Sequence, residues 1–176
     1  MSKPTPEEIA EHRRAILKHR YLVMDFLGIV INELSVRGDT HDESKLHEPE
    51  LEAFALVTPK LATTTYGSEE YKANLRSIKP AVDHHQQTNR HHPEFHGDLG
   101  MRGMNLVDLV EMICDWKAAS MRHNDGDCRK SIELNQKRFG YSDDLKAILL
   151  NTVDLLTDAD SATCSSISRY RGRGRR

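Results

Sequence analysis

Apolar residues recur every three or four positions along most of the chain, and this spacing constrains the fold more than any other feature. The recurrence is clearest near the N-terminus, at Ile9, Ile16, Val23, Leu27, Val30, Ile31 and Leu34. A period of 3.6 residues places such side chains on one face of a helix. The sequence has no convincing alternation of apolar and polar residues, as a half-buried strand would require. We therefore expect an all-α fold.

Capping and breaking residues divide this pattern into about six helices. Thr5 and Pro6 are typical of a helix start, and "RGD" at 37–39 is expected to end the first helix. The second is expected to begin near Pro49 and stop before Pro59. The remaining helical segments are 69–92, bent or restarted at Pro80, then 104–121, 127–139 and 142–156. The length favours one domain, residues 1–160, which we expect to be a helical bundle.

Composition excludes several classes of protein. The net charge is −2, so the body of the chain does not bind nucleic acid through bulk electrostatics. The longest apolar run, Phe26 to Ile31, is too short to span a membrane, and the charged N-terminus does not resemble a signal peptide. Three cysteines without C-x-x-C spacing indicate a reduced, cytoplasmic protein. Any metal must then be held by histidines and carboxylates.

The C-terminal residues differ in composition from the rest. The last eight residues include five arginines and two glycines, so we expect residues 161–176 to form a flexible basic tail. Such a tail could bind RNA or DNA, or could be solvated without a partner. The sequence also leaves open whether the chain forms a homo-oligomer through the apolar residues of 144–156.

Three stretches carry residues suited to metal or phosphate chemistry. "HDESK" places His41 beside Asp42, and Lys45 follows at a spacing that could bring its ammonium to a phosphate. A surface turn is the alternative interpretation. In "HHQQTNRHH", two histidine pairs are each seven residues apart and would share helical faces, with Asn89 beside them; a polar helix end is the alternative.

The third stretch is the apolar helix 104–121. Asp108, Glu111 and Asp115 share one of its faces. Burying carboxylates without partners costs several kcal/mol each, roughly, so a cation, or arginines or histidines from elsewhere, should accompany them. A solvent-facing acidic strip is less compatible with the large apolar residues on both sides.

Taken in order, these residues resemble the HD-domain superfamily of metal-dependent phosphohydrolases, which has an all-α fold. "HDESK" is similar to the "HD-x-[GS]-K" form of HD-GYP phosphodiesterases, although no "GYP" follows the His-His pair. "HDESKLHEPEL", "HHQQTNRHHPEF" and "LVDLVEMICDWKAAS" together resemble an uncharacterised HD-like family common in bacteriophages, which would place the chain in the host cytoplasm. The resemblance covers about residues 19–120.

The resemblance implies a role for each matching residue. The metal ligands would be His19, His41, Asp42 and Asp115. His84 and His85 would hold a second metal or a phosphate, and Lys45 would contact phosphate. We expect His91 and His92 to complete the second site or bind substrate, with His85 the most important of the cluster and His91 the least. Asn89 and Glu111 are further catalytic candidates, Glu111 by orienting a water or a ligand histidine.

The leading functional hypothesis is hydrolysis of a small phosphate ester, a nucleotide or cyclic nucleotide, by water activated on one or two divalent ions of Mn, Ni, Co, Zn or Fe. One alternative is a diiron oxygenase, since the fold also resembles that of inositol oxygenase. Another is a non-catalytic helical binding module whose tail binds nucleic acid. Metal content and salt-sensitive nucleic-acid binding would distinguish these three.

Overall fold

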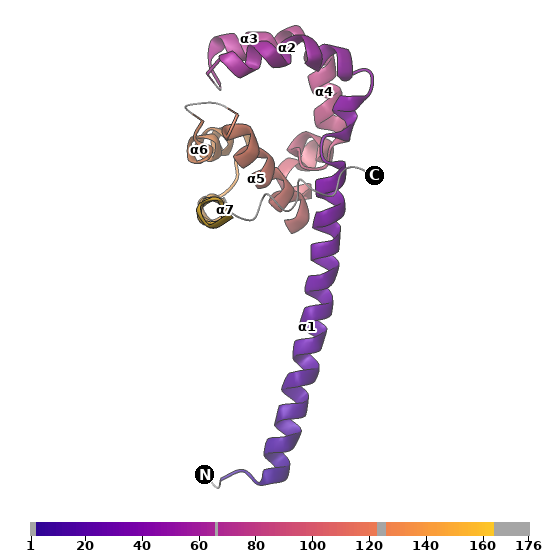
Figure 1. Cartoon of the computed structure of the whole chain (residues 1–176), viewed down its shortest axis with the longest axis vertical. Coiled ribbons are helices and arrows are strands. Elements are labelled where there is room, and N and C mark those ends of the chain that lie inside the picture. The colour runs from indigo at the N-terminus through magenta and orange to yellow at the C-terminus, as the bar shows by residue number, and fades with distance from the viewer. Residues whose placement is uncertain (1–2, 66, 123–125, 164–176) are drawn as a thin grey trace. The chain divides into compact units, whose positions relative to one another are not determined.

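The computed structural model describes residues 3–65, 67–122 and 126–163, and all regular structure in this part of the chain is helical (Figure 1). The all-α prediction is therefore confirmed. The elements in order are α1 (Pro6–Thr40), η1 (Glu43–Leu46), α2 (Leu51–Thr63), α3 (Glu69–Ser77), α4 (Lys79–Thr88), η2 (Pro93–Gly103), α5 (Leu106–Ser120), α6 (Cys128–Phe139) and α7 (Asp143–Thr163), where η denotes a 3-10 helix. The described residues thus hold seven α-helices, one more than the expected number, because the chain restarts at Pro80 rather than bending there. None of these helices is long and apolar enough to cross a membrane.

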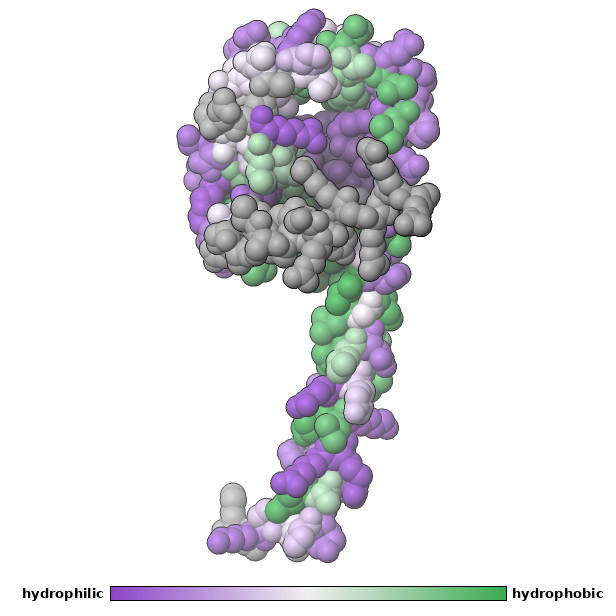
Figure 2. All heavy atoms as spheres, viewed as in Figure 1, coloured by the Kyte–Doolittle hydropathy of each residue, from purple (hydrophilic) through white to green (hydrophobic). Residues whose placement is uncertain are grey.

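The chain divides into two compact units, 1–41 and 42–176. The first is essentially α1. Thr5 caps it, with its hydroxyl accepting a hydrogen bond from the Glu8 amide, as the sequence predicts. The helix continues through "RGD" to Thr40, past the predicted end, because the Arg37–Glu33 ion pair and a bond from the Thr40 hydroxyl to the Val36 carbonyl support its last turns. None of its residues is buried within this unit, and Figure 2 shows apolar side chains among polar ones along it.

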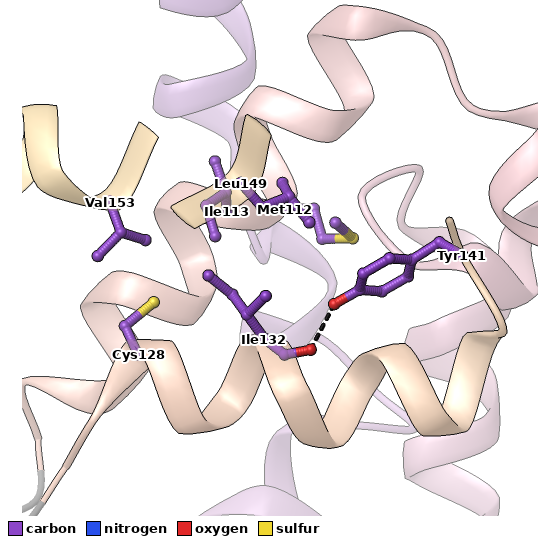
Figure 3. Close-up of a cluster of buried hydrophobic side chains, with 7 residues drawn as sticks. All are labelled: Met112, Ile113, Cys128, Ile132, Tyr141, Leu149 and Val153. Carbon is purple, nitrogen blue, oxygen red and sulfur yellow. Dashed lines mark hydrogen bonds between the residues drawn. The ribbon is translucent and has the colours of Figure 1, made fainter. Parts of the chain in front are cut away.

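The second unit holds the main hydrophobic core. Helices α5, α6 and α7 pack on one another around Met112, Ile113, Cys128, Ile132, Tyr141, Leu149 and Val153 (Figure 3). Ile132 and Met112 are completely buried. Gly140 ends α6 in the left-handed conformation, with φ of 67°, which glycine adopts without steric cost. The core is therefore formed by the C-terminal half of this unit, and α5 packs against α6 and α7 through it.

The N-terminal half of the second unit consists of shorter elements packed in sequence. Helix α2 contacts η1 and α3, and α4 contacts η1, α3 and η2. Helix α2 runs through Pro59 to Thr63, although we expected it to stop earlier, so the missing amide of Pro59 is tolerated within the helix. Ser68 caps α3 as predicted, by accepting a bond from the Tyr71 amide. The η1–α2–α4 contacts bring "HDESK" and the histidine cluster together.

The spacing of the four histidines predicts one continuous helix through the cluster, and this prediction is wrong. Helix α4 ends at Thr88 because the backbone of Asn89 is extended, with φ of −108° and ψ of 119°, and the Asn89 side-chain amide donates to the His85 carbonyl at 2.8 Å. His91 and His92 consequently lie in the turn that follows, and a common helical face does not explain their proximity to His85. The predicted tail at 161–176 falls almost entirely outside the described residues, and the prediction of one domain over residues 1–160 stays a prediction.

The core offers a pH test through Tyr141. Its hydroxyl donates to the Ile132 carbonyl at 2.5 Å, and burial raises the pKa of Tyr141 to about 12 (Figure 3). The unfolded chain ionises this phenol near pH 10, so stability is retained below pH 10 and declines as pH rises towards 12. In an absorbance titration at 295 nm, we expect one tyrosine to ionise near pH 12. This ionisation step should be absent in Tyr141→Phe. A Tyr141→Phe curve identical to the wild type would contradict this assignment.

Candidate metal centre

Asp42 occupies the turn that opens the second unit. Its backbone is left-handed, with φ of 58° and ψ of 18°, a conformation that aspartate tolerates better than most side chains. This turn leads directly into η1, where Lys45 Nζ donates to Asp42 Oδ2 at 2.5 Å. The other carboxylate oxygen, Oδ1, lies toward two buried histidines. The two oxygens of Asp42 therefore contact different groups.

His85 is the first of these histidines and comes from α4. It is 5% exposed, and its Nε2 lies 3.3 Å from Asp42 Oδ1. On the opposite edge of the ring, Nδ1 lies 3.0 Å from Glu50 Oε2. Burial, and after it the nearby Lys45 ammonium, lower the pKa of His85 below its ordinary value, although the carboxylates of Asp42 and Glu50 act in the opposite direction. The ring is thus held between two carboxylates, one at each nitrogen.

His91 has the same surroundings. It is 2% exposed, its Nδ1 lies 3.2 Å from Glu111 Oε1 on α5, and its Nε2 lies 3.6 Å from Asp42 Oδ1. Two imidazoles thus each place Nε2 near the same oxygen and Nδ1 near a second carboxylate, an arrangement that could hold a metal ion. Glu111 has the orienting position that the sequence suggested. His91, expected to matter least in the cluster, lies at the centre of this arrangement.

His92 completes the group. Its Nε2 lies 2.9 Å from His85 Nε2, and its ring contacts the His91 ring with centroids 4.2 Å apart. Burial and the imidazoles of His91 and His85 lower the pKa of His92 to about 3, although the carboxylates of Asp115 and Asp42 act in the opposite direction. His92 is therefore neutral at pH 7, the state in which imidazole binds a metal.

The spacing of these atoms fits a divalent ion. Ligand atoms of His85, His91 and His92 all lie within 4.8 Å of one another. Two ligands at about 2.1 Å from one zinc-like ion lie about 3.0 to 3.4 Å apart, depending on the coordination angle. The separation of Asp42 Oδ1 from His85 Nε2, 3.3 Å, falls within this range, and that from His91 Nε2, 3.6 Å, lies slightly above it. Imidazole with carboxylate is a donor set that suits Zn, Mn, Fe, Co or Ni.

The remaining predicted residues lie at differing distances from this group. His84 is partly exposed, with Nδ1 2.7 Å from Glu50 Oε1, and Asn89 donates to the Ser44 hydroxyl at 2.8 Å. Asp115 lies on α5, near enough for its charge to act on His92. His41 ends α1 and is joined to Asp42 by a peptide bond, whereas His19 lies within α1. Since His19 and His41 belong to the first unit, their role as ligands stays a prediction.

Two buried acids, Asp108 and Glu50, have partners on other elements that no motif in the sequence identified. Asp108, on the acidic face of α5, accepts two hydrogen bonds from the Arg90 guanidinium at 3.1 Å each, so an arginine is a partner of this carboxylate, as one of the alternatives proposed. Glu50 was missed entirely. It is one of three glutamates in "EPELE", and only its complete burial beside two histidines distinguishes it from Glu48 and Glu52.

Comparison with known proteins gives a family but no characterised relative. No curated protein matches the chain, and no solved structure does. The sequence model of one family, described as a family of unknown function, DUF5662, matches residues 8–155. This match spans all but the first two residues of α1, every residue of the candidate metal centre and most of α7. The chain therefore belongs to the DUF5662 family of unknown function.

Proposed function

We propose that this protein is a metal-dependent phosphohydrolase of the HD type that acts on a small phosphate ester, such as a nucleotide or cyclic nucleotide. One observation carries the proposal: His85 and His91 both place Nε2 within 3.6 Å of Asp42 Oδ1 while a carboxylate with little or no exposed surface lies at each Nδ1. Asp42, His85, His91 and His92 would hold the ion. When bound, a divalent cation lowers the pKa of a coordinated water and polarises a phosphoryl oxygen.

Two neighbouring side chains, Lys45 and His84, would bind the phosphate group of the substrate. Lys45 is about one-third exposed, and its ammonium pairs with Asp42, so it can approach an anionic substrate at the same place. His84 is 41% exposed at its side chain while Glu50 contacts its Nδ1, so its Nε2 can reach substrate. These two groups would offset charge on phosphoryl oxygens and supply a proton to the leaving group.

A metal-dependent hydrolysis screen tests the proposal. We expect the protein, supplied separately with Mn, Co, Ni, Zn or Fe(II), to release phosphate from p-nitrophenyl phosphate or a nucleotide, or to open a cyclic nucleotide. Chelation should abolish turnover, and Asp115→Ala should reduce it at least about tenfold if this carboxylate serves the centre. Absence of both turnover and bound metal would contradict the proposal. Oxygen consumption by an iron-loaded protein would instead support the diiron oxygenase.

A further inference from the structure

Glu50 is the most deeply buried acid beside the candidate metal centre, with no exposed surface. Its Oε1 lies 2.7 Å from His84 Nδ1, and its Oε2 lies 3.0 Å from both His85 Nδ1 and the Ser44 hydroxyl. It is also the N-cap residue of α2, although its side chain makes no capping hydrogen bond. The three hydrogen-bond donors offset the cost of removing this carboxylate from water.

We propose that Glu50 is a positioning residue that fixes His85 as the tautomer protonated on Nδ1, so that Nε2 keeps the lone pair with which it can bind a metal. An ionised carboxylate only accepts hydrogen bonds, so the 3.0 Å contact requires a proton on His85 Nδ1. In a neutral ring, Nε2 is then the acceptor and the metal-binding atom. The inference rests on the proposed function, since it assigns Glu50 a part in assembling the same metal centre.

A second group competes for His85 Nδ1. The Asn89 side-chain amide also lies 3.0 Å from this atom. If its NH2 group donated there, His85 would carry its proton on Nε2 and could not bind a metal through that atom. The NH2 group has only two hydrogens, and its shorter contacts, at 2.8 Å each, are with the His85 carbonyl and the Ser44 hydroxyl, so neither hydrogen is needed at Nδ1, whereas a carboxylate has no donor to offer. The charge-assisted bond to Glu50 is also the stronger of the two, so the carboxylate determines the tautomer.

The position of Glu50 allows it to orient His85 but prevents it from contacting a substrate directly. It is completely buried behind His84 and His85, and its two oxygens are occupied by ring nitrogens and by Ser44. His85 Nε2, in contrast, is 2.9 Å from His92 Nε2 and 3.3 Å from Asp42. Glu50 therefore acts on the metal through His85, by holding the ring plane and the proton.

The test is to measure the tautomer in the metal-free full-length protein by 15N NMR of the histidine rings. We expect wild-type His85 to carry its proton on Nδ1, and Glu50→Gln to shift it toward Nε2. By isothermal titration with Zn(II) and Mn(II), Glu50→Gln should bind each ion about 10- to 100-fold more weakly. Glu52→Gln makes the same change at an exposed position of α2 and should alter neither result.

Two further outcomes would overturn the proposal, and the first needs no variant, so it applies even if Glu50→Gln is poorly folded. A wild-type His85 protonated on Nε2 would overturn it without any variant. A tautomer that shifts in Asn89→Ala but not in Glu50→Gln would assign the role to the amide instead. A wild-type protein that binds neither ion would contradict the proposed function, whereas metal binding left unchanged by Glu50→Gln would overturn the role of Glu50 alone.

Discussion

Replacing Asp42 with alanine is expected to weaken binding of Zn(II) and Mn(II) by about 1,000-fold, more than the 10- to 100-fold cost of losing a supporting partner. Asp42 Oδ1 is the atom toward which the Nε2 atoms of both His85 and His91 point, at 3.3 and 3.6 Å. Its removal takes the anionic donor of the proposed ligand set from between the two imidazoles. Isothermal titration calorimetry on the metal-free protein measures the change directly.

The backbone of Asp42 requires a matched variant. Its φ of 58° disfavours alanine by about 1–2 kcal/mol, so Asp42→Ala weakens the turn as well as the site. Asparagine tolerates this conformation and keeps the shape of the side chain while removing the charge. Asp42→Asn should therefore fold like the wild type and still bind both ions at least about 10-fold more weakly. Asp144→Ala, an exposed acid on α7, should bind them normally. Unchanged affinity in Asp42→Asn and Asp42→Ala would exclude Asp42 as a ligand.

Local patterns in the sequence were sufficient to locate most helices. Helix α5 was predicted over 104–121 and spans Leu106–Ser120. The prediction succeeded because the apolar spacing of this segment is a local feature of the sequence. The helix caps at Thr5 and Ser68 were also predicted correctly. The errors arose where a local signal was overridden: α1 continues through "RGD" and α2 through Pro59. Tertiary and side-chain contacts decide such positions, and the apolar period does not report them.

The candidate site was predictable in its residue types but not in its pairings. The sequence identified Asp42, His85 and Glu111, and the structure brings these together within the second unit. The reason given for grouping the histidines was wrong, because α4 ends before His91. Glu50 lies 35 positions before His85, and its contact with that ring depends on how α2 and η1 pack against α4. No spacing rule relates residues on separate helices, so this partner required the structure.

Asp108→Ala is expected to lower the free energy of unfolding by about 3 kcal/mol, the lower end of the range for breaking a buried ion pair. The Asp108 carboxylate has no exposed surface, accepts from Arg90 Nε and Nη2 at 3.1 Å each, and caps α5 by accepting from the Asn105 amide at 3.0 Å. Arg90 is partly exposed, so water can solvate part of its charge once Asp108 is gone. Urea unfolding of the metal-free protein measures the loss, with Glu133→Ala, an exposed residue of α6, as the control.

Asp108→Ala should also affect the candidate metal centre, because Arg90 lies between Asn89 and His91 in the turn after α4. The pair with Asp108 fixes this turn against the first turn of α5, one turn before Glu111. In a double-mutant cycle with Arg90→Ala, we expect a coupling energy above about 1 kcal/mol, because the two side chains share two hydrogen bonds. Metal affinity should fall in Asp108→Ala as His91 loses its fixed position. Additive losses in the cycle would show that Asp108 stabilises α5 through its cap alone and leaves His91 positioned by Glu111.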